Sequence, residues 1–115
     1  MTSAISRIRN EINRMKFPYI RSVEHRENPL HLDIICKGPK GTKYVSTEFH
    51  ILLQYPVDYP YRPPTLTFVG DTQNETVASP RLKLLDPSIW QIAFQLQDIM
   101  EGIHYMLKIQ TDWIE

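Results

Sequence analysis

The sequence contains few reactive groups, no excess of charge and no long apolar run. Its single cysteine, Cys36, excludes an internal disulfide framework and a zinc cluster built on several thiolates. The four histidines lie on different predicted elements, and neither they nor pairs of carboxylates have the spacing of a metal or hydrolytic site. We therefore expect no metal and no cofactor.

Charge and hydropathy exclude two further classes of partner. Thirteen basic residues balance thirteen acidic ones, which argues against nucleic acid or a membrane surface as the main partner. No apolar run approaches the roughly 20 residues of a membrane-spanning helix, and residues 1–16 contain no apolar segment typical of a secretion signal. Since a free thiol fits a reducing compartment, we expect a cytoplasmic or nuclear protein.

The chain does have the length and the apolar periodicity of one small domain. Its 115 residues provide one hydrophobic core, so residues 1–115 are taken as a single domain. Residues 3–16 predict an amphipathic helix that Thr2 or Ser3 can cap. The helix carries one apolar stripe, formed by Ile5, Ile8, Ile12 and Met15.

An antiparallel meander of four strands follows the predicted helix. The strands are expected at residues 19–23, 30–37, 47–54 and 65–69. A connection over residues 70–88 has weak periodicity, and from Ile89 the helical period returns, through Ile92 and Leu96. The helix starts either after Ser88, as its N-cap, or a few residues later. The fold class is therefore α+β: an N-terminal helix, a four-stranded antiparallel meander sheet, a long loop and a C-terminal helix.

Proline is unusually concentrated in one segment. Four of the nine prolines lie within Tyr55–Pro64, which reads Tyr-Pro-Val-Asp-Tyr-Pro-Tyr-Arg-Pro-Pro. A proline has no backbone donor and a fixed φ, so the segment cannot be a central strand. We expect an ordered, extended connection whose tyrosines pack on the body of the domain.

This segment resembles the core motif of the ubiquitin-conjugating enzymes, a Phe/Tyr-Pro-x-Asp-Tyr-Pro-Phe-x-Pro-Pro run after the third strand. Residues 30–39 are similar to the family's second strand and its Gly-Pro turn, and Trp90 stands where the family has a tryptophan before its second helix. The resemblance covers about residues 3–110. It implies the ubiquitin-conjugating fold without the family's usual last two helices.

The positions that correspond to the family's catalytic site differ from the family pattern. In the family, a cysteine eight residues before the tryptophan accepts ubiquitin as a thioester, and here that residue is Leu82. Asn74 keeps the place of the asparagine in the family's His-Pro-Asn motif, and we interpret it as a loop residue. Cys36 lies on the face of its strand that is predicted to be buried, so we interpret it as a structural thiol. The comparison with the family therefore implies no catalytic residue.

Two candidate partner-binding surfaces lie near the helix and the proline segment. Family members meet the activating enzyme and the ligase through the first helix, which here carries Arg7, Arg9 and Arg14. The family's first ligase-binding loop has an aromatic and a basic residue, here Tyr61 and Arg62. Whether Tyr61 is exposed or packs on the domain is left open at this stage.

The outer face of the sheet is a third candidate. If Cys36 points inward, Ile35 points outward, and Leu52 shares that face. Two apolar residues among polar neighbours resemble the non-covalent ubiquitin-binding face of the family.

The resemblance as a whole implies a catalytically inactive conjugating-enzyme variant. Such a variant is a binding module that pairs with an active conjugating enzyme, a ligase subunit or ubiquitin. Two alternatives stay open: a structural subunit of a larger complex with no ubiquitin role, and an active conjugating enzyme with an unrecognised nucleophile.

Overall fold

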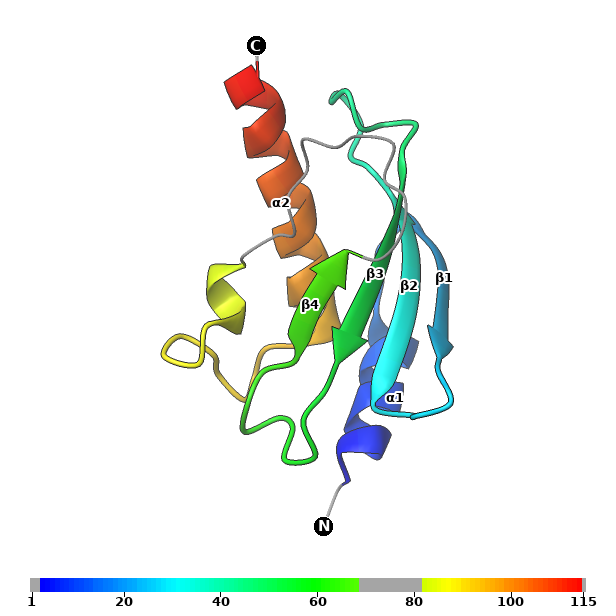
Figure 1. Cartoon of the computed structure of the whole chain (residues 1–115), viewed down its shortest axis with the longest axis vertical. Helices are drawn as coiled ribbons and strands as arrows, with labels where there is room; N and C mark the ends of the chain where they lie inside the picture. Colours follow the sequence, from blue (N-terminus) through cyan, green and yellow to red (C-terminus); the bar gives the residue numbers. More distant parts are fainter. Residues whose placement is uncertain (1–2, 69–81, 115) are drawn as a thin grey trace.

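The computed structural model describes residues 3–68 and 82–114, with side chains described as far as residue 109. Along the chain, a first helix is followed by a sheet and then by a second, longer helix (Figure 1). In order, the elements are α1 (Ala4–Arg14), β1 (Ile20–His25), β2 (His31–Lys37), β3 (Glu48–Gln54), β4 (Thr65–Phe68), the 3-10 helix η1 (Lys83–Leu85) and α2 (Leu96–Ile114).

Helix α1 forms as its sequence predicts. Ser3 is the N-cap, and its hydroxyl accepts a hydrogen bond from the backbone N–H of Ser6 at 3.1 Å. Ile8 is fully buried and Ile12 is half-buried, so the apolar stripe faces the core. Glu11 is buried on the same side of α1. This burial is unexpected, because a charged carboxylate normally remains in contact with water.

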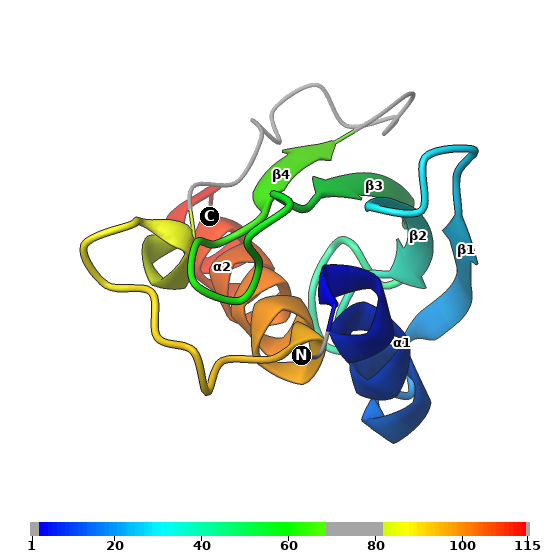
Figure 2. The ribbon, with the colours of Figure 1, turned by 90° about the horizontal axis from the view of Figure 1, so that it is seen from below.

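The four strands pair in the order β1-β2-β3-β4, all antiparallel, as a meander. Both helices lie on the concave side of the sheet (Figure 2). The side chains of β2 and β3 alternate between buried and half-buried or exposed, and α2 packs on their buried faces. Each fully buried leucine or isoleucine there stabilises the fold by about 2 kcal/mol. The inward residues of the two strands are Leu32, Ile34, Cys36, Phe49, Ile51 and Leu53.

The predicted strands agree with the structure to within one or two residues, and β4 is followed directly by residues outside the described part. The prediction for residues 70–88 needs one correction. Residues 83–85 form η1, whereas residues 70–81, with Asn74 among them, lie outside the described residues.

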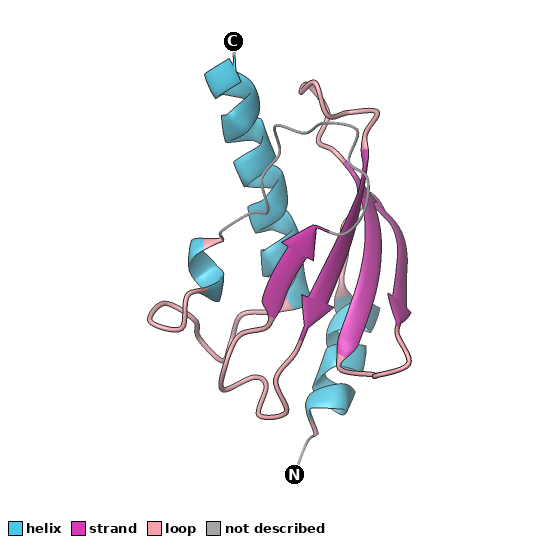
Figure 3. Ribbon diagram, viewed as in Figure 1, coloured by secondary structure: helices cyan, strands magenta, loops and turns pink. Residues whose placement is uncertain are grey.

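Of the two predicted starts of the C-terminal helix, the structure has the later one. Residues 87–89 and 92–93 form turns, and the helix begins at Leu96, after a loop (Figure 3). Ser88 is not its N-cap, because the Ser88 N–H and hydroxyl both donate to the Asp86 carboxylate within a turn. Ile92 is therefore half-exposed in a turn instead of lying on the helical stripe.

Candidate functional site

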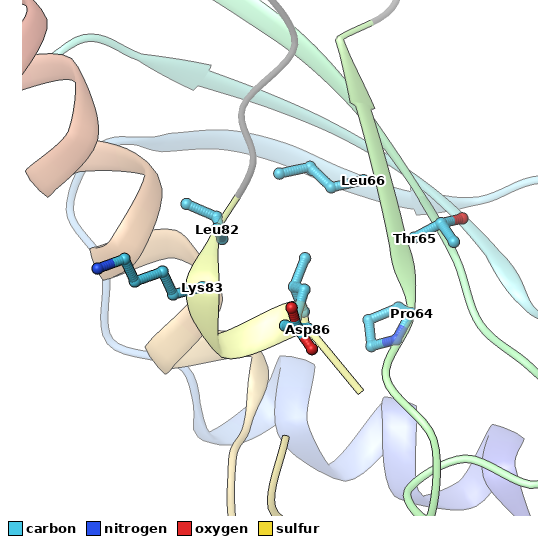
Figure 4. Close-up of a pocket in the computed structure, with 7 residues that line it drawn as sticks. Pro64, Thr65, Leu66, Leu82, Lys83 and Asp86 are labelled. Carbon is cyan, nitrogen blue, oxygen red and sulfur yellow. The ribbon is translucent and has the colours of Figure 1, made fainter. Parts of the chain in front are cut away.

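Leu82, which the sequence predicts to lie at the position of the family's cysteine, immediately precedes η1. It borders a pocket of about 360 Å³ between η1 and the start of β4 (Figure 4). The lining residues are Pro64, Thr65, Leu66, Leu82, Lys83, Leu85 and Asp86. None of them carries a thiol or an imidazole. Hydrogen bonds from Ser88 lower the pKa of the Asp86 carboxyl and hold it in a turn.

On its other side, Leu82 helps to form an apolar groove along α2. A Cβ atom added at Gly102 would lie 3.4 Å from Leu84 Cδ2 and 3.6 Å from Leu82 Cδ1, so both leucines pack over this glycine. The groove has a volume of about 570 Å³ and includes the exposed Tyr105. We call it the Leu82 groove; its residues are Leu82, Lys83, Leu84, Ile89, Gly102, Tyr105, Met106 and Ile109.

The cysteine lies elsewhere. Cys36 is fully buried in β2, and burial raises the pKa of its thiol to about 12. Its backbone pairs with Phe49 of β3, within the sheet. The predicted burial of Cys36 is therefore confirmed.

A buried polar cluster holds the proline segment against both helices. The Glu11 carboxylate accepts hydrogen bonds from Arg7 Nε at 2.7 Å, from the Tyr59 hydroxyl at 2.6 Å and from the backbone N–H of Leu96 at 2.7 Å. We call this cluster of Arg7, Glu11, Tyr59 and Leu96 the Glu11 junction. Burial raises the pKa of Tyr59, so its hydroxyl stays protonated and remains a donor.

The Glu11 junction explains where α2 begins. The first backbone N–H groups of a helix have no partner within the helix, and here one of them, that of Leu96, donates to a carboxylate from α1. The Asp98 side chain also accepts from the backbone N–H of Gln95 at 2.8 Å. The start of α2 is therefore fixed by a contact between residues that are 85 positions apart.

The proline segment is free of strands, as predicted, but it is not extended. The Tyr59 N–H donates to the Pro56 carbonyl at 3.1 Å, and the Tyr61 N–H donates to the Asp58 carbonyl at 2.9 Å. The segment therefore turns, and its Tyr59-Pro60 bond is cis. Tyr55 and Tyr59 are buried, and Trp90 Nε1 donates to the Pro60 carbonyl at 2.7 Å. Tyr61 does not pack on the domain: 72% of it is exposed. Next to it, Arg62 Nε donates to both oxygens of Asp58, at 2.9 and 2.8 Å.

The three arginines of α1 have different environments. Arg7 is half-buried, because it pairs with Glu11 and donates to the carbonyls of Ile92 and Phe94. It also lies over the ring of Tyr59, 5.6 Å from the centroid. Arg9 and Arg14 are exposed. Arg7 therefore holds the turn before α2, while the other two are free to meet a partner.

Ile35 and Leu52 lie on the outer face of the sheet, away from the helices. Ile35 is opposite His50, and Leu52 is opposite Asp33, which makes the two apolar side chains diagonal neighbours. Both are half-buried. The structure thus brings Arg7 next to the proline segment that carries Tyr61, but it separates Ile35 and Leu52 from that surface by the thickness of the sheet.

The described residues contain neither a metal site nor a membrane-spanning helix. Within residues 3–68 and 82–114, no group of three or more histidine, cysteine, aspartate or glutamate side chains is placed to hold a metal ion. In the same part of the chain, no helix is both long and apolar enough to cross a membrane.

Two solved structures that share this fold are both described as ubiquitin-conjugating enzymes. Human ubiquitin-conjugating enzyme E2 G1 superposes with a TM-score of 0.73 over 90% of this chain and 91% of that one, at 23% identity. A structure described as a novel ubiquitin-conjugating enzyme gives 0.69 over 88% of this chain and 71% of the other, at 18% identity. The predicted ubiquitin-conjugating fold is therefore confirmed, with two α-helices among the described residues.

Sequence comparison leads to the same class. The model of the family described as ubiquitin-conjugating enzyme matches residues 7–112, and the chain belongs to this family. Ubiquitin-conjugating enzyme E2 14 of Schizosaccharomyces pombe is 26% identical over 102 residues, which are 86% of this chain and 66% of the relative. Ubiquitin-conjugating enzyme E2 6 of Kluyveromyces lactis is 27% identical over 89 residues, which are 75% of this chain but 36% of the relative. The chain thus spans from about one third to just under two thirds of these relatives.

Sequence reasoning missed the Glu11 junction. One signal was available, because Glu11 follows Ile8 by three positions and so falls on the apolar face of α1, where an acidic side chain needs a partner. Arg7, four positions earlier, was one such partner. The hydroxyl of Tyr59 and the backbone of Leu96 could not be identified without the fold.

Proposed function

We propose that this protein is a non-catalytic member of the family that acts as a binding module. It pairs with an active conjugating enzyme, a ligase subunit or ubiquitin, and assists conjugation by positioning. The observation that supports the proposal is the packing of the Leu82 side chain over Gly102, at the position where the resemblance leads us to expect the family's nucleophile. A location in the cytoplasm or the nucleus stays part of the proposal.

The chemistry of thioester formation supports this function. The attacking species is a thiolate, and a leucine side chain has no lone pair to attack with. Burial raises the pKa of the Cys36 thiol to about 12, so at neutral pH the thiol stays protonated and is a poor nucleophile. It is also fully buried, so the tail of a ubiquitin could not reach it without local opening of the sheet.

The exposed part of the proline segment supports a role in binding. Tyr61 extends into solvent beside the Arg62–Asp58 ion pair, while Tyr59 and Trp90 fix the backbone beneath it. An exposed aromatic residue on a rigid support has the composition of an interface hot spot. By positioning a bound reactant, such a module can lower the activation free energy of a reaction by several kcal/mol, although the module contributes no catalytic group.

A charging assay tests the absence of catalysis. The protein is mixed with activating enzyme, ubiquitin and ATP, and we expect no adduct that is removed by a thiol reductant. An active conjugating enzyme serves as the positive control in the same reaction. A thiol-sensitive adduct that is lost in Cys36→Ala would identify Cys36 as the nucleophile and overturn the proposal. An adduct that resists the reductant and persists in Cys36→Ala, as an oxyester or an amide would, would overturn it through an unrecognised nucleophile.

A binding experiment tests the positive half of the proposal. Labelled protein is titrated by NMR with ubiquitin and with a panel of active conjugating enzymes and ligase domains. We expect saturable shifts with at least one of them, weakened by Tyr61→Ala but not by Glu27→Ala, an exposed residue on the β1–β2 turn. If no member of the panel binds, the alternative of a structural subunit with no ubiquitin role is supported instead.

A further inference from the structure

The turn between β2 and β3 concentrates positive charge. Lys37, Lys40 and Lys43 follow one another with no acidic residue between them. Among the described residues, the ammonium groups of Lys37 and Lys40 make no ion pair, whereas Lys43 lies over the ring of Tyr44. Lys37 is opposite Glu48 in the sheet, but the Glu48 carboxylate pairs with Arg21, so neither Lys37 nor Lys40 makes an ion pair among the described residues.

These two lysines border a hollow whose other walls are apolar. The hollow has a volume of about 380 Å³ and lies between the end of the α1–β1 connection and the β2–β3 turn. Its remaining walls are formed by Pro18, Tyr19, Gly38 and the exposed Val45. It therefore offers positive charge and apolar surface side by side.

The backbone around the hollow is held by contacts from three directions. The N–H of Lys37 donates to the Tyr19 carbonyl at 2.9 Å, and the N–H of Gly38 donates to the Thr47 carbonyl at 3.1 Å. The Lys37 carbonyl lies 2.8 Å from His104 Nε2 of α2. A Cβ at Gly38 would lie 2.0 Å from the Tyr44 carbonyl oxygen, so only glycine allows this close approach of the chain. The walls are therefore positioned before any ligand binds.

We propose that this hollow binds an acidic peptide segment of a partner protein. A carboxylate of the segment pairs with Lys37 and Lys40, and a neighbouring aliphatic side chain packs on Tyr19 and Val45. An acidic peptide is favoured over nucleic acid or a lipid surface. Two lysines that make no described ion pair, on a chain of zero net charge, neutralise too few charges to bind a polyanion. This site is separate from Tyr61 and Leu82 and does not rest on the function proposed above.

An NMR titration with a synthetic probe tests the site. The probe is a pentapeptide of four glutamates around a central leucine, and its matched control has glutamines in place of the glutamates. With the acidic peptide we expect saturable amide shifts at Tyr19 and across residues 37–45. Because exposed charge pairs are screened by salt, affinity falls about fivefold or more between about 0.05 M and about 0.5 M ionic strength.

Charge variants locate the contact. Lys40→Glu reverses one charge, and Lys37→Gln removes the other without placing a second carboxylate opposite Glu48. Together they are expected to weaken binding about fivefold or more. Lys83→Glu makes the same reversal on the exposed η1, beyond β4, and leaves affinity unchanged (Figure 1). Far-ultraviolet circular dichroism confirms that all variants remain folded.

Three results would each overturn the proposal. The first is equal binding of the acidic and the glutamine peptide. The second is binding that survives the double change at Lys37 and Lys40. The third is a combination of two findings: the acidic peptide produces no shifts, and phosphatidylserine vesicles bind the protein but not the variant changed at both lysines.

Discussion

The first turn of α2 and the Leu82 groove along it are stabilised by different kinds of contact. At its first turn, the Glu11 junction buries a carboxylate and gives it three hydrogen-bond donors from α1, the proline segment and α2 itself. At the Leu82 groove, the contacts over Gly102 are made by hydrocarbon atoms of Leu82 and Leu84. One side depends on matched polar groups, whereas the other depends only on packing.

The two regions differ in how strongly the stability of the fold depends on the identity of their side chains. The Glu11 junction joins three parts of the chain, so the loss of one member leaves buried polar groups without partners. Leu82 contributes apolar contacts that many side chains of similar size could replace. A family member can therefore keep the first region and change the second without losing its structure.

The largest expected effect comes from Glu11→Ala. This change leaves the Tyr59 hydroxyl and the Leu96 N–H without their buried acceptor and removes the partner of Arg7. We expect the free energy of unfolding to fall by about 3 kcal/mol, measured by urea denaturation followed by circular dichroism. The exposed Glu27→Ala is the control, with a change below about 0.5 kcal/mol. Similar losses in both variants would contradict a central role for the Glu11 junction.

The next largest effect is expected from Tyr59→Phe, which removes one donor to the Glu11 carboxylate and keeps the ring. We expect a loss of about 1.5 kcal/mol in the same assay, because the hydrogen bond involves a buried acceptor. Tyr61→Phe deletes the same atom from a side chain that is 72% exposed, so its expected change is below about 0.5 kcal/mol. Equal effects at the two tyrosines would show that Tyr59 acts through its ring alone.

A smaller effect is expected in the Leu82 groove. Leu82 is half-buried, so Leu82→Ala should cost about 1 kcal/mol, below the range for a fully buried leucine. Thermal unfolding by calorimetry measures it, and Ile89→Ala, at a more exposed position of the groove, is the control. A loss as large as that of Glu11→Ala would remove the distinction between the two sides of α2.

The smallest expected effect has the opposite sign. Glycine in the middle of a helix is unfavourable, and the new methyl of Gly102→Ala would be in ordinary contact with Leu84. We expect stabilisation by about 0.7 kcal/mol, seen as a higher denaturation midpoint. Gly38→Ala is the matched comparison and should destabilise, because its methyl would meet the Tyr44 carbonyl. Destabilisation at both positions would indicate that the groove has no room even for one methyl.

Alternation along the strands made most of the fold predictable. Leu32, Ile34 and Cys36 are buried in β2 as their period of two predicts, because local geometry alone decides which face of a strand each side chain occupies. The prolines of Tyr55–Pro64 excluded a strand there for an equally local reason. The family resemblance then supplied how the elements are arranged.

Contacts between distant parts of the chain were not predictable in the same way. Ile92 and Leu96 share a helical spacing, but the helix begins only where Glu11 meets the Leu96 N–H. For the same reason, the sequence offered Arg7, Arg9 and Arg14 as equal candidates for partner binding. Only the folded chain distinguishes Arg7, through the carbonyls of Ile92 and Phe94.

The two edge strands of the sheet carry different features that weaken edge-to-edge pairing with another molecule. β1 and β4 are the outermost strands of the sheet formed by the described residues. An unpaired strand edge is a template for fibril growth, and short length, charge and proline all weaken such a template. β4 has four residues and follows Pro63 and Pro64, whereas β1 carries Arg21 and Glu24. Among the described residues, both edge strands therefore disfavour the addition of a strand from another molecule.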